Sequence, residues 1–115
     1  MRLMIAIIQP TKLALVREQL HRLGVSRMTV CDAFGFGRQR GQLPTYRGIE
    51  YRTDLLRKVM VEIVVSEEHV EATIDVLSAA AKTGTAGEIG DGKIFVLPLV
   101  EAIDLASGVR GAGVV

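Results

Sequence analysis

The run Val59-Met60-Val61-Glu62-Ile63-Val64-Val65 (VMVEIVV) is the most strand-like segment of this sequence, and it decides the fold. Its β-branched residues favour an extended backbone. An earlier segment, Met28 to Phe36 (MTVCDAFGF), also mixes β-branched and apolar residues. We expect these two strands to pair, although the basic, glycine-containing loop between them has about 20 residues and most connections in compact domains have about 2 to 6.

Two further segments read as strands because each is short, apolar and closed by a proline. Leu3 to Ile8 (LMIAII) precedes Gln9-Pro10, and Lys93 to Leu97 (KIFVL) precedes Pro98. Such short runs that end at a proline are typical of strands. The sequence therefore predicts four strands.

Two helices are expected between these strands. From Thr11 to Leu23 the apolar residues recur on one helical face, and Gly24 is placed to end that helix. Ser66 is the expected N-cap of the second helix, whose first turn is acidic and which runs to about Lys82. The apolar positions with helical spacing are Leu13, Val16, Leu20 and Leu23 in the first helix and Val70, Ile74, Leu77 and Ala81 in the second.

The resulting order, β-α-β-β-α-β, predicts an α+β fold of the ferredoxin-like sandwich type. Right-handed crossovers place both helices on one face of the sheet, so that the other face has no cover within one chain. Because the strands are apolar on both sides, this bare face predicts an oligomer. At 115 residues, of which 49% are hydrophobic, the chain forms one domain, residues 1–115.

Charge is concentrated locally. The formal net charge of +1 gives no global field that would attract nucleic acid. Between residues 38 and 58, however, there are six basic residues and only two acidic ones, and anionic ligands are expected near this loop. The lone Cys31 excludes an internal disulfide, and without a signal-like region or an apolar run of about 18 residues we expect a cytoplasmic protein.

Catalytic groups are scarce. Cys31 lies in a predicted strand, and His21 and His69 lie on separate helices without metal-ligand spacing. No HExxH, GxSxG or paired-cysteine pattern occurs. We therefore expect a binding protein and not an enzyme.

The segment Gly87 to Lys93 (GEIGDGK) fits GxxxxGK, which is the spacing of a phosphate-binding P-loop. A strand follows instead of Ser or Thr and a helix, so the P-loop fold is not expected. The successive glycines can still expose backbone N–H groups to an anion beside Lys93, or they can simply permit a tight turn. Gly35 to Gly41 precedes no helix, and so it fails as a dinucleotide fingerprint.

The role of three other residues can be interpreted in two ways. Glu62 is the one charge in its strand, and it either binds a polar ligand or makes an intersubunit or solvent contact. Tyr46 and Tyr51 are the only tyrosines, and both lie in the long loop. They either pack the loop against the body or expose a hydroxyl for modification or a rigid contact for a partner.

The combination of GFGRQRG, YRGIEY with Lys58, and IGDGKIF on this pattern resembles the PII nitrogen-regulatory signal-transduction protein family, from Met1 to about Gly108. The resemblance implies a homotrimer with three clefts between subunits. ATP or ADP would bind in these clefts as a ligand, and 2-oxoglutarate, the effector, would join it through Mg²⁺. The function implied is control of nitrogen metabolism through target proteins.

The resemblance also assigns roles to residues. Gln39 would help to hold Mg²⁺ and Lys58 would pair with a 2-oxoglutarate carboxylate. The segment at about 37–55 would be the T-loop that docks on targets, residues 83–92 the glycine-rich B-loop, and residues 99–115 the C-terminal segment. The nucleotide-binding residues would be Gly35, Gly37, Arg38, Glu62, Thr83, Gly84, Gly90, Asp91, Gly92 and Lys93.

Partner contacts are implied for Arg40, Tyr46, Arg47 and Tyr51 in the T-loop. Tyr51 also matches the tyrosine that is uridylylated in some lineages. The implied partners are an ammonium transporter or other membrane transporter, a nitrogen-assimilation enzyme or a kinase, with a transporter recruiting the cytoplasmic protein to the membrane.

The sequence departs from the family pattern at four places, and the loss of cations at two of them favours an alternative, a diverged PII-like adenylate sensor that prefers ADP or AMP and does not respond to 2-oxoglutarate. Asp104 and Ala106 stand where the family usually has arginines that reach the phosphates, and Gln9 stands where Lys or Arg is common. Loss of such cations weakens a triphosphate site. The loop 83–92 also carries about three extra residues, Thr85 to Gly87 in one alignment, and the T-loop tip, residues 42–45, lacks the usual acidic group.

Overall fold

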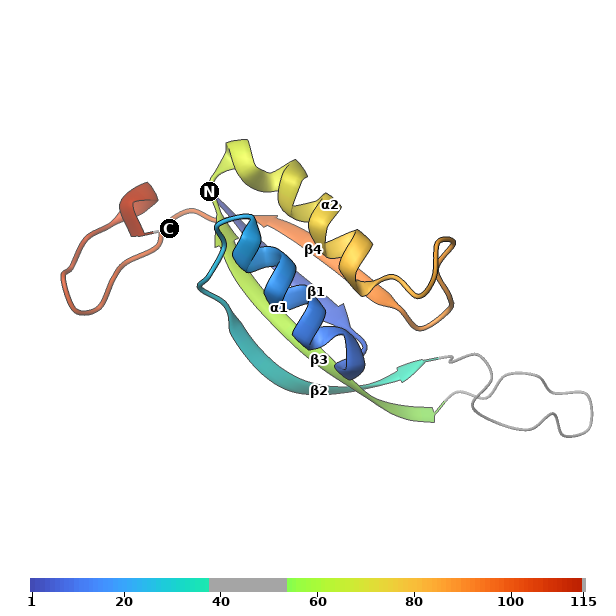
Figure 1. Ribbon diagram of the computed structural model, residues 1–115. Helices are drawn as coiled ribbons and strands as arrows, with labels where there is room; N and C mark the ends of the chain where they lie inside the picture. Colours follow the sequence, from blue (N-terminus) through green and yellow to red (C-terminus); the bar gives the residue numbers. More distant parts are fainter. Residues whose placement is uncertain (38–53, 115) are drawn as a thin grey trace, which may run out of the picture.

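A computed structural model describes residues 1–37 and 54–114 as one antiparallel sheet covered on one face by two helices (Figure 1). The strands are β1 (Arg2–Ile8), β2 (Thr29–Gly37), β3 (Asp54–Val65) and β4 (Gly92–Pro98), in the spatial order β2-β3-β1-β4. The helices are α1 (Leu13–Arg22) and α2 (Val70–Ala81), with short 3₁₀ turns at Pro10–Lys12, Glu67–His69 and Gly111–Val114. The α+β ferredoxin-like arrangement is thus confirmed.

Helix α1 ends where the sequence predicts. Gly24 adopts a positive φ of 96°, which glycine reaches without steric cost. The backbone N–H of Val25 then donates to the Leu20 carbonyl at 2.9 Å, and the N–H of Gly24 donates to the His21 carbonyl at 3.0 Å. This pair of bonds satisfies carbonyls that the helix end leaves open.

The start of the second helix differs in detail from the expectation. Ser66 does precede the helical segment with an extended backbone, but its hydroxyl makes no capping bond to a backbone N–H. The hydroxyl lies 2.6 Å from Nδ1 of His69 instead. A 3₁₀ turn therefore intervenes before α2 begins at Val70.

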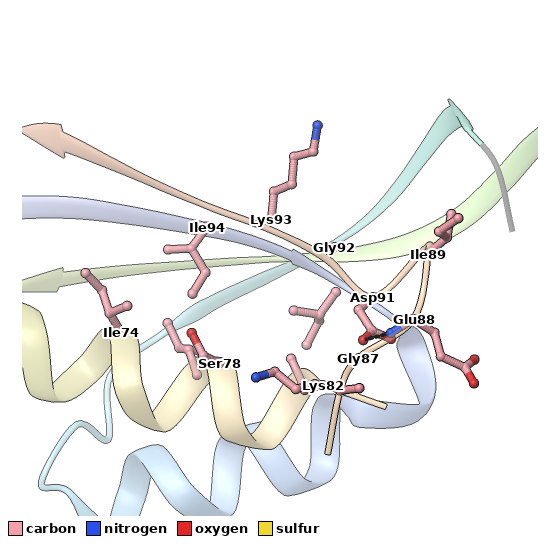
Figure 2. Close-up of a pocket in the computed structure, with 14 residues that line it drawn as sticks. Ile74, Ser78, Lys82, Gly87, Glu88, Ile89, Asp91, Gly92, Lys93 and Ile94 are labelled. Atoms are coloured by element: carbon pink, nitrogen blue, oxygen red, sulfur yellow. Dashed lines mark hydrogen bonds between the residues drawn. The ribbon is translucent and has the colours of Figure 1, made fainter. Parts of the chain in front are cut away.

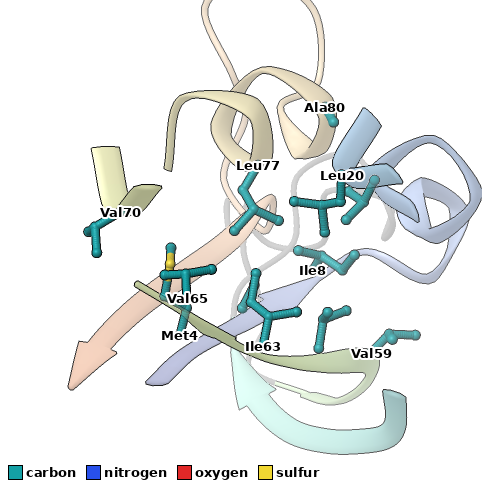
Figure 3. Packing of buried hydrophobic residues seen from close by; sticks show 12 residues of the cluster. Met4, Ile8, Leu20, Val59, Ile63, Val65, Val70, Leu77 and Ala80 are labelled. Carbon is teal, nitrogen blue, oxygen red and sulfur yellow. The ribbon is translucent and has the colours of Figure 1, made fainter. Parts of the chain in front are cut away.

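The core lies between the helices and one face of the sheet (Figure 3). Alternate residues of the two central strands point toward the helices, as the period of two in a strand requires. The buried side chains are Met4, Ala6 and Ile8 of β1, Val59, Val61, Ile63 and Val65 of β3, Val16 and Leu20 of α1, and Val70, Leu77 and Ala80 of α2.

The opposite face, which we call the open face, is covered by no described element. The strand register places Ile5 opposite both Glu62 and Phe95, and Ile7 opposite both Met60 and Lys93. The strands carry apolar residues on this side too, and Phe95, one of them, is 49% exposed. The predicted bare apolar face is therefore present within one chain.

Strand β3 begins at Asp54, which is earlier than the expected start at Val59. Its first part pairs with the end of β2, where Phe36 faces Leu55 and Phe34 faces Arg57. The pair Arg57–Asp32, at 3.0 Å, supports this extension with a contact between charged side chains. Because Gly37 and Asp54 both lie in strands, the connection itself consists of residues 38–53, outside the described residues.

Candidate functional site

The glycine-rich loop (residues 83–92) leaves α2 and returns to β4 at one end of the sheet (Figure 1). At this end β1 finishes and the paired ends of β2 and β3 project beyond it. β4 follows the loop directly, beginning at Gly92. The prediction that GEIGDGK is not followed by a helix, and so is not a P-loop, is therefore confirmed.

Asp91 holds the glycine-rich loop together from within. Its Oδ1 accepts a bond from the Thr83 hydroxyl at 2.6 Å. Its Oδ2 accepts bonds from the backbone N–H groups of Thr83 at 3.0 Å and of Glu88 at 2.8 Å. The carboxylate is thus engaged inside the loop, which gives Asp91 a positioning role; its predicted contact with a nucleotide stays a prediction.

The pKa of the Asp91 carboxyl reflects these contacts. Partial desolvation raises it, but the bonds from the Thr83 side chain and from the Thr83 and Glu88 backbones outweigh that effect and lower the pKa below its usual value. The carboxyl group is therefore ionised near neutral pH and accepts all three bonds. Residues Thr85 to Gly87 lie between Thr83 and Glu88, the two positions that Asp91 joins.

The carbonyl of Gly90 receives two side-chain donors. Nζ of Lys58 in β3 donates to it at 2.6 Å, and Nε2 of Gln9, just after β1, donates to it at 2.8 Å. Partial burial lowers the pKa of Lys58, while the nearby charge of Asp91 raises it. Lys58 thus contacts the glycine-rich loop, and its predicted contact with a carboxylate ligand stays a prediction; the contact of Gln9 with this loop was not predicted from the sequence.

A groove of about 680 Å³ runs between the glycine-rich loop, α2 and β4 on the helix side of the sheet (Figure 2). Ile74, Ser78 and Lys82 of α2 line it, together with Ile94 of β4. Figure 2 shows the Lys93 side chain pointing away from these residues, to the other side of the strand. Although Lys93 is among the residues that line this groove, its ammonium group therefore belongs with the open face.

The structure gathers most of the described candidate residues at one end of the sheet. Thr83, Gly84, Gly90, Asp91 and Gly92 form the loop, and Lys58 contacts it. Glu62 is half-buried on the open face in β3. Gly35 and Gly37 lie in β2, which is separated from β1 by β3. The T-loop candidates Arg38, Gln39, Arg40, Tyr46, Arg47 and Tyr51 lie outside the described residues.

The C-terminal segment starts at the other end of the sheet. Gly92 pairs with Ile8 but Pro98 pairs with Arg2, so that β4 carries the chain about 20 Å away from the glycine-rich loop. Beyond Pro98 the chain forms a separate turn away from the sheet (Figure 1). In one chain, therefore, the positions 104 and 106 lie far from Lys93.

Asp104 organises this terminal turn. Its Oδ2 accepts bonds from the backbone N–H of Ser107 at 2.9 Å and from the Ser107 hydroxyl at 2.6 Å, and these bonds lower the pKa of the carboxyl group. The backbone N–H of Asp104 donates to the Val109 carbonyl at 2.8 Å. An arginine at position 104 would remove the two bonds from Ser107, whereas the exposed Ala106 makes no such contact.

The described residues lack both a membrane-spanning helix and a cluster of metal-binding side chains. None of the helices in residues 1–37 and 54–114 is long and apolar enough to cross a membrane. In the same part of the chain no group of three or more His, Cys, Asp or Glu side chains converges in a way that would hold a metal ion.

Comparison with known proteins decides the family. The sequence profile described as Nitrogen regulatory protein P-II matches residues 1–108. The chain belongs to the P-II family. This assignment confirms the resemblance seen in the sequence motifs, and it gives the chain a nitrogen-regulatory role in signal transduction.

Individual P-II relatives match along nearly the whole chain. A nitrogen regulatory protein P-II of Rhodospirillum rubrum is 49% identical over 106 residues, which cover 92% of each chain. A P-II protein of Azospirillum brasilense is 47% identical over the same length. The nitrogen regulatory protein GlnK1 of Methanosarcina mazei is 41% identical over 111 residues, covering 96% of this chain and 94% of the relative.

Proposed function

We propose that this P-II protein is a trimeric sensor that binds ATP or ADP in clefts between subunits and passes the signal to target proteins through its T-loop. The observation that carries the proposal is the glycine-rich loop, shaped by Asp91 and followed at once by Lys93. Such a loop offers backbone N–H groups to phosphate oxygens, and the lysine adds a positive charge.

The location between subunits is supported by where the chemical groups lie. Lys93 and Glu62 both face the apolar open face, which a second copy of the chain would cover. The glycine-rich loop and the turn around Asp104 lie at opposite ends of β4. A nucleotide that touches both must therefore lie between two chains.

A second ligand, 2-oxoglutarate, is proposed next to the first, bound through Mg²⁺ with help from Gln39. Lys58 carries a positive charge that suits a carboxylate, and its ammonium group contacts the glycine-rich loop. The nucleotide phosphates would supply ligands to Mg²⁺, since magnesium is commonly held by substrate phosphates with few protein groups.

The targets are proposed from the family resemblance. An ammonium transporter or other membrane transporter, a nitrogen-assimilation enzyme or a kinase would bind the T-loop, with Arg40, Tyr46, Arg47 and Tyr51 in contact. Uridylylation of Tyr51 would add an anionic group to this surface. A transporter target would recruit a cytoplasmic trimer to the membrane.

A second candidate function is an adenylate sensor that prefers ADP or AMP and ignores 2-oxoglutarate. It is favoured by Asp104, whose carboxylate is engaged in its own turn where the family usually has an arginine. It is also favoured by Gln9, which is neutral and bonds to the Gly90 carbonyl. Both features lower the positive charge available to a triphosphate or a dicarboxylate.

Calorimetric titration separates the two functions. We expect heat on adding ATP or ADP with Mg²⁺, and further heat from 2-oxoglutarate only when MgATP is present. Lys93→Ala should weaken nucleotide binding about tenfold or more, because a charge-assisted bond is lost. Lys82→Ala is the matched control, since Lys82 lines the groove on the helix side, and it should leave the affinity unchanged.

Three other outcomes have definite meanings. Binding of ADP or AMP without any effect of 2-oxoglutarate would select the adenylate sensor. Turnover of the nucleotide during the titration would show an enzyme. No heat from any adenine nucleotide would contradict both proposed functions.

A further inference from the structure

The ends of β2 and β3 form a two-stranded ribbon with large apolar side chains exposed on one side. Phe34 is 65% exposed, Phe36 is 79% exposed and Leu55 is 60% exposed. Phe36 pairs with Leu55 in the strand register, and Phe34 lies two residues earlier on the same side of β2. We call these three side chains the apolar end of the ribbon. Such a group marks a contact surface, whereas one exposed apolar residue alone would be ordinary.

The apolar end lies on the helix side of the sheet but beyond the helices. Val59 of β3 is buried in the core, and the alternation of side chains along the strand puts Leu55 on the same side. Figure 1 shows the paired ends of β2 and β3 extending past α1. The other side of β2 carries Gly35 and Gly37 here. The aromatic side chains are therefore confined to one side of a projecting ribbon.

Positive charge adjoins the apolar end in the sequence. The 16 residues that join β2 to β3, residues 38–53, include four basic residues and one acidic residue. Toward the body of the sheet, Arg57 lies opposite Phe34 and forms an ion pair with Asp32 at 3.0 Å. A group of basic residues of this size beside an apolar segment is typical of proteins that bind anionic lipid headgroups. The charge and the exposed apolar side chains therefore favour the same kind of partner.

We infer that the apolar end binds the surface of an anionic lipid bilayer, with Phe34, Phe36 and Leu55 buried among the headgroups. Two residues of a strand span about 7 Å. A segment that lies on a bilayer buries its apolar side chains about 5–10 Å deep. The apolar end thus has the length that this mode of binding requires, and Phe and Leu with basic residues nearby are typical of it.

A bilayer suits this surface better than a protein groove for two reasons. A protein would need a pocket that matches the projecting side chains, whereas a bilayer takes up apolar groups without a fixed shape. The net positive charge of residues 38–53 also complements an anionic lipid surface. This contact is with the lipid itself, so it is separate from the recruitment by a transporter proposed above and does not depend on nucleotide binding.

Flotation of the full chain with protein-free vesicles tests the inference. One set of vesicles is an equimolar mixture of phosphatidylcholine and phosphatidylglycerol, and the other is phosphatidylcholine alone. We expect the protein to float with the mixed vesicles and to bind phosphatidylcholine alone about tenfold more weakly or less, because the anionic headgroups are missing. High concentrations of sodium chloride should also weaken binding to the mixed vesicles, since salt screens the charges.

Phe34→Ser and Phe36→Ser test the apolar part of the contact. Each substitution should weaken binding to the mixed vesicles about tenfold, because a large apolar side chain no longer leaves water. Leu105→Ser is the matched control and should leave the binding unchanged, since Leu105 is 97% exposed but lies in the terminal turn at the other end of the sheet. All three side chains are mostly exposed, so thermal unfolding should stay the same in each variant.

Three outcomes would overturn the inference. A full chain that does not float with the mixed vesicles would reject it and leave the proposed nucleotide sensing intact. Binding that neither Phe34→Ser nor Phe36→Ser weakens would show that charge alone attracts the protein to lipid. A change in the number of chains per particle in these two variants, without any vesicle binding, would assign the apolar end to a contact between copies of the chain.

Discussion

Gly92→Ala is expected to destabilise the fold by about 3 kcal/mol or more. Gly92 pairs with Ile8 at the start of β4, with a φ of 119°, and a Cβ built on it would lie 1.7 Å from the carbonyl oxygen of Ile7. No side-chain rotation relieves this clash, because the obstructing atom belongs to the backbone of β1. The start of β4 would have to move away from the sheet, and denaturant unfolding should show the loss directly.

Gly84→Ala is the matched control for that prediction. Gly84 also has a positive φ, of 65°, but an added Cβ would have nothing within 4 Å. This variant should therefore cost only about 1 to 2 kcal/mol, the price of the left-handed backbone. If both variants unfold alike, the close approach of β4 to Ile7 is not what restricts position 92.

Asp91→Ala is expected to reduce nucleotide affinity at least tenfold, about the effect of one lost bond to a charged group, while changing thermal stability little. Removal of the carboxylate deletes three bonds that tie Thr83 and Glu88 across the loop. The backbone N–H groups proposed to receive the phosphates then lose their fixed arrangement. The loop is at the surface and contributes no residue to the core, so global unfolding should remain close to that of the unmodified protein.

Glu88→Ala serves as the control for Asp91. Glu88 bonds to Asp91 through its backbone N–H, which the substitution leaves in place. Equilibrium titration of MgATP into both variants should therefore separate them. Affinity of Asp91→Ala equal to that of the unmodified protein would show that the three bonds do not position the nucleotide site.

Much of the fold could be predicted because it depends on local pattern. The β-branched residues of VMVEIVV, the helical spacing of the apolar residues and Gly24 each specify an element without tertiary information. The early start of β3 was missed because Arg57 and Lys58 interrupt the apolar pattern. That part of the strand is stabilised by its pairing with β2 and by the ion pair between Arg57 and Asp32. Both contacts depend on the fold.

The candidate site divides in the same way. The glycine spacing and Lys93 identify the loop in the sequence, but the bond between Gln9 and Gly90 joins residues 81 positions apart and depends on the register of β1 with β4. The roles of Asp91 and Asp104 are local, and an aspartate that bonds to a nearby backbone N–H is a common turn signal. The family resemblance predicts ligand contacts at these positions, where the structure has carboxylates that organise turns.

Native mass spectrometry tests the central claim, that the nucleotide binds at the glycine-rich loop between subunits, most directly. It reports the number of chains and of bound nucleotides in the same particle. We predict trimers that carry up to three ATP or ADP molecules, and no nucleotide on any monomer. A monomer that retains nucleotide, or a trimer that retains none at saturating concentrations, would contradict the account.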